Sequence, residues 1–185
     1  TFYESKMKFK DSLQFYTLTK EHFKLYAKRL CSLNNINFIN IKLFHVYGDD
    51  DDETKFIPQM ISMMLSPSPS LNFSSGKQKR DFVHVLDISK AYVLIIKHLK
   101  EKQYMYKNFE LGTGKTISLR SLIKKAYELS KSKQKLIFSN KYNNNNEPRK
   151  IKADLKNINN LGWKPQISIE GGLKKLIKNE KKKKN

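Results

Sequence analysis

The sequence has few of the residues that cross-link or anchor a protein chain. Only one of its 185 residues, Cys31, is a cysteine, so no disulfide can form within the chain. The four histidines are scattered without the spacing of metal ligands, which argues against a structural metal site. The longest apolar run, residues 91–96, is far shorter than the roughly 20 residues that cross a bilayer. These absences predict a soluble protein of the reducing cytoplasm without a metal or a membrane partner.

Arginine is also scarce, although the formal net charge is +20. Only four of the 37 basic residues are arginine, the residue preferred for forked contacts with phosphates and base edges. The lysines are spread along the whole chain beside asparagine and isoleucine, which favours a compositional bias over solvated surfaces. A basic nucleic-acid-binding protein is an alternative, but we predict no nucleic-acid partner. The lysine run predicts a disordered tail over residues 179–185.

No glycine-rich loop of the type G-x-G-x-x-G or G-x-x-G-x-x-G follows a strand anywhere in the chain. Such a loop places a dinucleotide's pyrophosphate at a helix N-terminus, so these residues alone cannot complete a dinucleotide site. Residues 112–116, G-T-G-K-T, resemble the end of a P-loop, but that motif requires glycine where Phe109 stands. Because the sequence also begins at Thr1 rather than at methionine, we expect a fragment of a longer protein.

Hydrophobic periodicity predicts alternating helices and strands. Ser118 has the side chain of a helix cap, and so does Asp87. A long helix followed by a strand rich in β-branched residues is half of a βαβ unit, so the alternation predicts an α/β fold. The predicted helices cover residues 12–33, 55–65, 87–99, 118–129 and the stretch from 168, and the predicted strands cover 36–46, 71–73, 82–85, 109–111 and 136–138.

Tyr16 and Lys20 form a Y-x-x-x-K pair within the first predicted helix. Residues four apart share a helix face, with Cβ atoms about 5–6 Å apart. A tyrosine that transfers protons near neutrality needs its pKa lowered from about 10 toward 7, and an ammonium about 4 Å away supplies an interaction of that order. Tyr127 and Lys131 have the same spacing, so the pair by itself favours an ordinary surface contact.

The order of further motifs along the chain shows what the pair is part of. After the Y-x-x-x-K pair come H-V-Y-G at 45–48, F-I-P at 56–58, R-D-F-V-H-V-L-D at 80–87, L-G-T-G at 111–114 and L-G-W-K-P at 161–165. Together these motifs resemble the NAD-dependent epimerase/dehydratase family, the extended short-chain dehydrogenases that act on nucleotide sugars. The resemblance covers nearly the whole chain up to the lysine tail, and it is strongest to the 4-keto-sugar reductases and epimerases that make deoxyhexoses for surface polysaccharide such as the O-antigen of lipopolysaccharide.

The resemblance implies an α/β architecture, in which the C-terminal part of a Rossmann-type parallel sheet is interleaved with a small α+β substrate-binding domain. Residues 1–48 and 86–111 would belong to the Rossmann part, and 49–85 and 112–178 to the substrate domain. The missing N-terminal Rossmann half would be the partner of this chain. The long tyrosine-bearing helix would also allow a homodimer.

The resemblance further implies catalytic and cofactor roles. Tyr16 would exchange the proton of a sugar hydroxyl or ketone while a hydride passes to or from NAD or NADP, and Lys20 would hold the cofactor ribose. The Thr1 hydroxyl would bind the reacting oxygen. His45 and Val46 would lie beside the nicotinamide, although the first of these positions is commonly asparagine in the family.

For the substrate, a nucleoside diphosphate sugar, the resemblance implies a second set of residues. Arg80 would grip the diphosphate with its guanidinium fork. A second arginine of the family would fall at Asn144, with Arg149 near but out of register. The nucleotide pocket would be lined by Lys55, Phe56 and Phe73.

The two residues after Thr1 narrow the type of reaction. Dehydratases of the family have an Asp-Glu pair there, whereas this chain has Phe2 and Tyr3, which favours reduction or epimerisation over dehydration. The remaining alternative is a non-catalytic fragment or subunit that folds only with an N-terminal partner, because the predicted strand at 36–46 lacks its neighbours.

Overall fold

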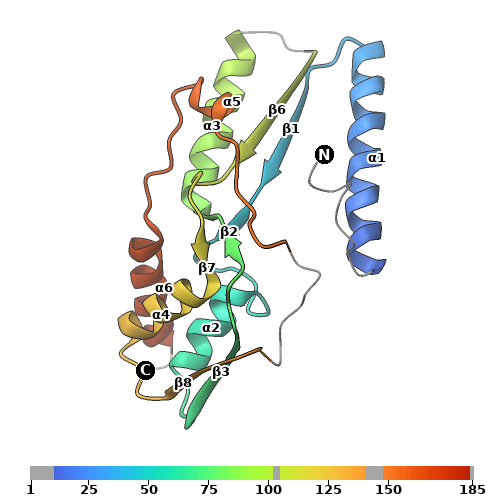
Figure 1. The fold of residues 1–185 in the computed structure, drawn as a ribbon. Helices are drawn as coiled ribbons and strands as arrows, with labels where there is room; N and C mark the ends of the chain where they lie inside the picture. Colours follow the sequence, from blue (N-terminus) through green and yellow to red (C-terminus); the bar gives the residue numbers. More distant parts are fainter. Residues whose placement is uncertain (1–10, 102–104, 141–147, 184–185) are drawn as a thin grey trace.

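The computed structural model describes residues 11–101, 105–140 and 148–183, which form an α/β fold with parallel strand pairs (Figure 1). This confirms the predicted fold class. The helices are α1 (Asp11–Leu33), α2 (Phe56–Met64), α3 (Val85–Glu101), α4 (Leu119–Ser130), α5 (Lys156–Asn159) and α6 (Ile169–Lys183). The strands are β1 (Phe38–Leu43), β2 (His45–Tyr47), β3 (Ser70–Ser74), β4 (Lys79–Arg80), β5 (Phe82–His84), β6 (Tyr106–Leu111), β7 (Ile117–Ser118) and β8 (Lys135–Ser139).

The strands pair two by two. β1 runs parallel to β6, β2 parallel to β5 and β3 parallel to β8, while β4 and β7 are antiparallel. A single residue, Phe44, separates β1 from β2, and Asp81 separates β4 from β5. Each of these two segments therefore changes its pairing partner at one residue, which brings the ends of β1 and β6 next to the β2–β5 pair.

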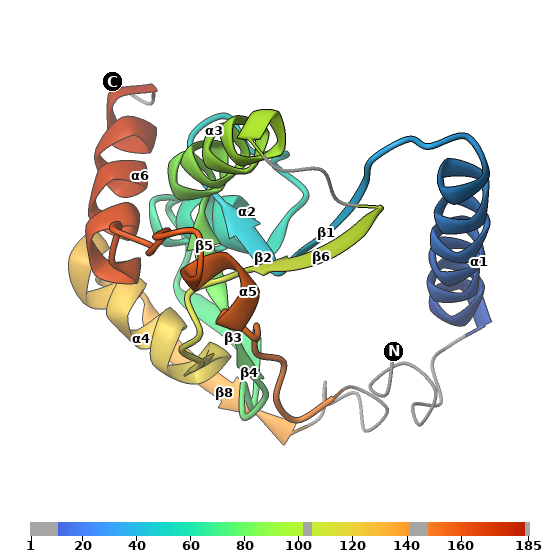
Figure 2. The same cartoon turned by 90° about the horizontal axis from the view of Figure 1, so that it is seen from above.

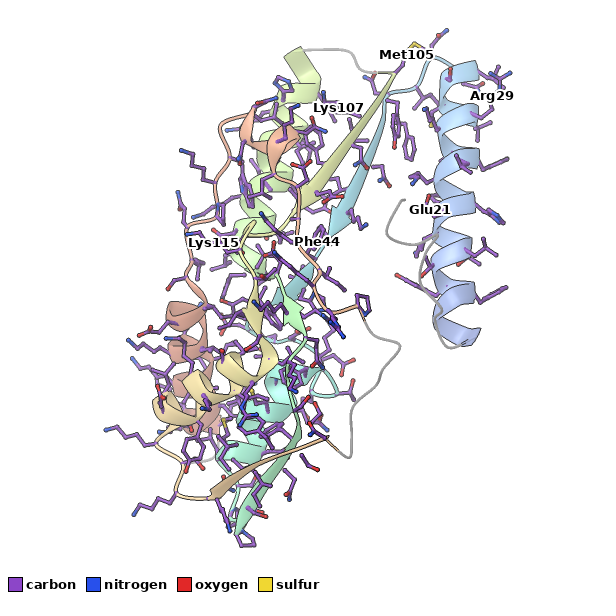
Figure 3. The ribbon with its side chains drawn as sticks, in the orientation of Figure 1. Glu21, Arg29, Phe44, Met105, Lys107 and Lys115 are labelled. Carbon is purple, nitrogen blue, oxygen red and sulfur yellow. The ribbon has the colours of Figure 1, made fainter. Side chains whose placement is uncertain are left out.

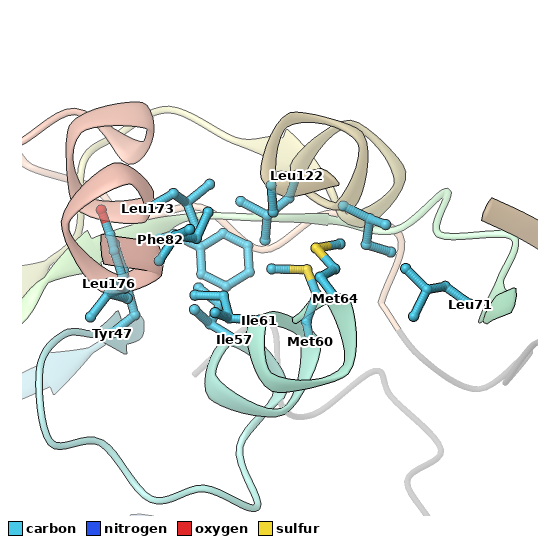
Figure 4. Packing of buried hydrophobic residues seen from close by; sticks show 13 residues of the cluster. Tyr47, Ile57, Met60, Ile61, Met64, Leu71, Phe82, Leu122, Leu173 and Leu176 are labelled. Atoms are coloured by element: carbon cyan, nitrogen blue, oxygen red, sulfur yellow. The ribbon is translucent and has the colours of Figure 1, made fainter. Parts of the chain in front are cut away.

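Two hydrophobic cores support these strands. The first joins α2, α4 and α6 to β2 and β5, and Figure 4 shows Phe82 surrounded by side chains from these helices. The second packs α3 against β1 and β6 and includes Trp163 from the segment after α5. The cores meet along β2 and β5, because Tyr47 and Phe82 belong to the first and Val83 to the second. Alternating side chains of this one strand pair thus connect the two hydrophobic cores.

One predicted helix cap is confirmed and the other is corrected. The Ser118 hydroxyl accepts a hydrogen bond from the Ser121 N–H at 3.0 Å, which caps α4 as predicted. Helix α3 instead begins at Val85, and the Asp87 carboxylate accepts from the N–H groups of Gln166 and Ile167. Asp87 is fully buried, so it fastens the segment after L-G-W-K-P to the first turn of α3 rather than capping its own helix.

The predicted disorder of residues 179–185 is wrong for most of that stretch. Helix α6 continues to Lys183, with three lysines in its last turn, where cations interact favourably with the helix dipole. The Lys181 ammonium donates to the Ser130 carbonyl at 3.0 Å, and the Asn179 amide donates to Asp49 at 2.7 Å. The charge run is therefore the end of a packed helix, a context that composition alone does not reveal.

Helix α1 stands to one side of the rest of the chain in both views of the ribbon (Figures 1 and 2). It contacts β1, Ala27 is buried, and the Lys28 ammonium lies 4.5 Å from the centre of the Tyr106 ring. Within the described ranges, no helix has the length and hydropathy needed to span a membrane. Many large apolar side chains of α1 are nevertheless exposed: Phe15, Leu18, Phe23, Leu25, Tyr26, Leu30 and Leu33.

Candidate active site

The carboxyl ends of β1 and β6 lie at the same edge, because Leu43 is paired with Leu111 in the parallel register. Ligands of open α/β sheets bind at such edges. Figure 3 shows this region, with Phe44 just past the end of β1 and Lys115 on the turn that follows β6. The Phe44 N–H donates to the Leu111 carbonyl at 3.1 Å, which holds the two strand ends together.

Asp81 organises this edge. Its carboxylate is fully buried and accepts four hydrogen bonds. Thr113 donates two of them, from its N–H at 2.7 Å and its hydroxyl at 2.6 Å, Gly114 N–H donates at 2.9 Å, and Ala153 N–H donates at 3.1 Å. Gly112 is required beside them, since a Cβ there would lie 2.6 Å from the Ala153 Cβ and 2.7 Å from the carboxylate. The turn after β6 is therefore built around one carboxylate and is not a phosphate loop.

Arg80, the residue before Asp81, is buried, with only 6% of its surface exposed. Its Nη1 donates to the Lys79 carbonyl at 3.0 Å and to the Pro148 carbonyl at 2.8 Å. The Arg149 carbonyl accepts from the Lys79 N–H at 2.8 Å, while the Arg149 side chain is exposed. Two backbone carbonyls thus fix the direction of the guanidinium.

His45 begins β2, directly opposite Phe82 on β5. Its N–H donates to the Asp81 carbonyl at 3.1 Å, and its ring packs edge-on against the Phe82 ring with centroids 5.4 Å apart. The ring atom Nδ1 is buried, and it has no hydrogen-bond partner within the described residues. Burial, followed by the neighbouring Arg80, lowers the pKa of His45, with Asp81 acting in the opposite direction.

The same face of the β2–β5 pair continues inward as a row of aromatic side chains. The Tyr47 ring lies against Phe82 and His84, with the His84 centroid 5.2 Å away. Burial lowers the pKa of His84 and raises that of Tyr47. Gly172 of α6 faces this row, because a Cβ there would overlap the Tyr47 hydroxyl.

The predicted nucleotide-pocket residues lie on other elements. Lys55 is exposed just before α2 and pairs with Asp51 at 2.6 Å, a contact that raises its pKa. Phe56 begins α2 and Phe73 lies on β3, and both pack at the edge of the first core. The structure thus gathers Phe56 and Phe73 around one core, whereas the Lys55 ammonium points to a neighbouring acid.

The predicted catalytic pair lies on α1. Tyr16 is 58% exposed, and the Lys20 ammonium lies 5.4 Å from the centre of its ring, so the two side chains share a helix face as predicted. Val46 is half-buried in β2 and packs against the second core. Thr1 and Asn144 lie outside the described residues. Arg80 of β4 lies close enough to His45 to act on the charge of the imidazole, whereas Val46 faces the second core. The roles of all these residues stay predictions.

A cavity of about 970 Å³ lies elsewhere, between the 48–53 loop, α2 and α6. None of the residues predicted for catalysis or binding lines it. Its charged lining is already paired in part, since Asp49 accepts from Lys175 at 2.6 Å and from Asn179. We therefore place the candidate active site at the strand ends and not in this cavity.

Sequence reasoning missed two acids that hold distant segments of the chain together. Asp81 and Asp87 both belong to the R-D-F-V-H-V-L-D block, from which only the role of Arg80 and a helix cap were predicted. Each accepts backbone hydrogen bonds from a segment much later in the chain. A signal was available, because both acids flank the largely apolar stretch 82–86, and carboxylates are rarely buried unless they are paired.

The sequence of residues 3–112 matches the model of the NAD dependent epimerase/dehydratase family. Among characterised relatives, CDP-abequose synthase of Salmonella typhimurium is 32% identical over 165 residues, which cover 88% of this chain and 55% of that protein. The dTDP-4-dehydro-6-deoxyglucose reductase of Escherichia coli is 25% identical over 168 residues, covering 88% and 51%. The chain thus spans about half the length of the curated relatives it matches.

Solved structures share the fold. UDP-glucose 4-epimerase of Thermotoga maritima with UDP-glucose superposes with a TM-score of 0.80 at 23% identity, over 92% of this chain and 54% of that one. RMD of Pseudomonas aeruginosa complexed with NADPH gives a TM-score of 0.71 at 19% identity, over 86% and 55%. At these identities the likeness establishes the architecture alone.

Proposed function

The chain belongs to the NAD-dependent epimerase/dehydratase family, and from this premise we propose that it forms the catalytic and substrate-binding part of an enzyme that reduces or epimerises a nucleoside diphosphate sugar. The observation that carries the proposal is the pairing of Tyr16 with Lys20 on one face of α1, in a chain that also buries Arg80.

In the proposed mechanism the Tyr16 hydroxyl moves the proton. On reduction it donates that proton to the oxygen of a sugar ketone, and in the reverse direction it takes the proton from the hydroxyl. The Lys20 ammonium stabilises the phenolate that remains and holds the ribose of the cofactor. The bound nicotinamide, from NAD or NADP, supplies the hydride. Thr1 is proposed to hold the reacting oxygen, and His45 and Val46 to lie beside the nicotinamide.

Substrate binding rests on Arg80. A guanidinium can donate two parallel hydrogen bonds to phosphate oxygens, and here the group is buried and held by the Lys79 and Pro148 carbonyls. Phe56 and Phe73, at the edge of the first core, and Lys55 are proposed to line the nucleotide pocket. Asp81 supports this site, because it holds the turn at Thr113 to the segment that carries Arg80.

The cofactor site requires a second part. The described residues include no glycine-rich loop, so this chain is proposed to contribute only the nicotinamide side, with the adenosine side held by an N-terminal Rossmann half. Within the described residues β1 has β6 as its only paired neighbour, and Ile36 and Leu43 at its ends are exposed. Parallel sheets are normally buried, which supports further strands on the free edge of β1.

For the finer identity of the substrate we propose a 4-keto-6-deoxyhexose of the kind used for surface polysaccharide. The similarity to CDP-abequose synthase and to dTDP-4-dehydro-6-deoxyglucose reductase supports this choice. We propose the reducing cytoplasm as the compartment, in keeping with the single Cys31 thiol.

The test is an assay of the full-length protein that contains this chain. We expect it to oxidise NADPH or NADH when CDP- or dTDP-4-keto-6-deoxyhexose is added, with a deoxyhexose product that NMR identifies. An epimerase would instead convert the nucleotide sugar without net oxidation of the cofactor. Absence of both reactions on all nucleotide sugars tried would contradict the proposal.

A further inference from the structure

Arg80, the last residue of β4, lies close enough to His45 of β2 to act on its charge. His45 lies directly opposite Phe82, and Arg80 precedes Phe82 by two residues. Because side chains alternate along an extended segment, Arg80 and Phe82 point to the same face, and Arg80 is the diagonal neighbour of His45. The imidazole packs edge-on against the Phe82 ring, which fixes its position on this face.

The surroundings of the His45 imidazole make its charge sensitive to a nearby ligand. Its Nδ1 is buried with no hydrogen-bond partner among the described residues, an arrangement that costs free energy until a partner arrives. Two charged side chains act on it, both from the β4–β5 segment: Arg80 opposes a second positive charge and Asp81 favours one. The next titratable groups on that face are Tyr47 on its own strand and His84 on β5. In the free protein the balance keeps His45 neutral near pH 7.

Resting on the proposed function, we propose that His45 takes up a proton from solvent when the diphosphate of a nucleotide sugar binds at Arg80, so that substrate affinity depends on pH through this imidazole. A diphosphate brings negative charge to the face where Arg80 had been the dominant charge, and an anion within a few ångströms favours the charged imidazole. Protonation also makes both ring nitrogens donors, which suits phosphate oxygens. An asparagine at this position could not make this change, because its amide does not titrate.

The direction of the pH effect on affinity follows from the pKa of His45 in the free protein and in the complex. In the free protein the pKa of His45 is below its usual value, mainly through burial, and the bound anion raises it. Between the two values the complex holds one more proton than the free protein. Affinity therefore increases as pH falls through this interval, by up to about tenfold per pH unit.

The experiment measures the His45 titration by NMR in the full-length protein with its cofactor, between about pH 5 and 8, with and without UDP-glucose, CDP-glucose or dTDP-glucose. These probes carry a diphosphate esterified at both ends, so the ligand itself has no titrating group near neutrality. Calorimetry in buffers of different ionisation enthalpy counts the protons taken up. His45→Asn removes the titration, and His22→Asn, an exposed histidine of α1, is the matched control.

We expect the pKa of His45 to rise by at least about one unit on saturation. Uptake should approach one proton, and the pH dependence of the affinity should disappear in His45→Asn and persist in His22→Asn. A bound complex with an unchanged His45 titration would overturn this inference and leave the proposed substrate class standing. If none of the three nucleotide sugars binds at any pH, the diphosphate site at Arg80 fails as well.

Discussion

Asp81 accepts two hydrogen bonds from Thr113, one from the backbone N–H at 2.7 Å and one from the hydroxyl at 2.6 Å. The two residues are 32 positions apart, and the contact fixes the turn after β6 to the segment that carries Arg80. Ala153 donates to the same carboxylate, so three distant parts of the chain meet at one buried group. The position of the proposed diphosphate site is therefore set by a residue that need not touch the substrate.

Replacing Asp81 by asparagine should destabilise the fold strongly. The amide NH₂ would face backbone donors and leave some of them unpaired in a buried site, at a cost of about 2–4 kcal/mol. Urea unfolding followed by fluorescence of Trp163, the only tryptophan, measures the loss. Asp50→Asn, at an exposed position whose left-handed backbone asparagine tolerates, is the control and should leave the midpoint unchanged. Equal unfolding midpoints for the two variants would show that the Asp81 carboxylate does not stabilise the turn after β6.

Two adjacent glycines of α6 should respond differently to alanine. Gly172→Ala places a Cβ against the Tyr47 ring, 2.7 Å from Cε2, so the row of aromatic side chains must shift at a cost of about 1–3 kcal/mol. Gly171→Ala meets only the flexible Ser168 hydroxyl at 3.2 Å and should be neutral or stabilising by up to about 1 kcal/mol, since alanine favours helices. Thermal unfolding of both variants makes the comparison. A stable Gly172→Ala would show that α6 does not pack on Tyr47.

The stability of the chain should fall as the pH drops from about 7 toward 5. Burial lowers the pKa of both His45 and His84 in the folded state, whereas the unfolded chain titrates near 6.5. Below that value the unfolded state binds more protons, so the stabilisation is complete above about pH 7 and declines in acid. Unfolding free energies at pH 7.5 and 5.5 measure the change. His84→Asn should flatten it and the exposed His22→Asn should not; a fold equally stable at both pH values would contradict the burial of these rings.

Replacing Arg80 by lysine should weaken nucleotide-sugar binding by about tenfold or more, because an ammonium cannot make the parallel bonds of a guanidinium. Arg149→Lys is the matched control, since the Arg149 side chain is exposed nearby. The same variant tests whether Arg149 takes the role of the second family arginine, whose place in this chain is occupied by Asn144. Titration with UDP-glucose, CDP-glucose and dTDP-glucose compares the two. If only Arg149→Lys loses affinity, the diphosphate site has been placed on the wrong arginine.

Much of the fold could be predicted from local pattern. Periodicity located helix α1 and strand β1, and Ser118 marked the start of α4, because these signals depend on neighbours in the sequence. The order of the motifs also gave the family correctly, which the family match confirms. Local pattern could not give pairing at long range, such as the contacts that Asp81 and Asp87 make with segments 32 to 80 positions away.

The candidate site was predictable in part for the same reason. The spacing of Tyr16 and Lys20 is a local property and appears on α1 as expected. The second Y-x-x-x-K match, Tyr127 and Lys131, resolves into a structural contact, since the Tyr127 hydroxyl donates to the Gln134 carbonyl and Lys131 ends α4 with a left-handed backbone. The proximity of His45 to Arg80 depends on the pairing of β2 with β5, which no spacing in the sequence encodes.

The central claim is that the Tyr16 hydroxyl transfers the proton, and its most direct test is the turnover of Tyr16→Phe in the full-length protein. Tyr26→Phe is the matched control, because Tyr26 lies on the same helix and is 67% exposed, compared with 58% for Tyr16. The account predicts that Tyr16→Phe lowers kcat by at least about a hundredfold with little change in nucleotide-sugar affinity, while Tyr26→Phe keeps its activity. Full turnover in Tyr16→Phe would contradict the account.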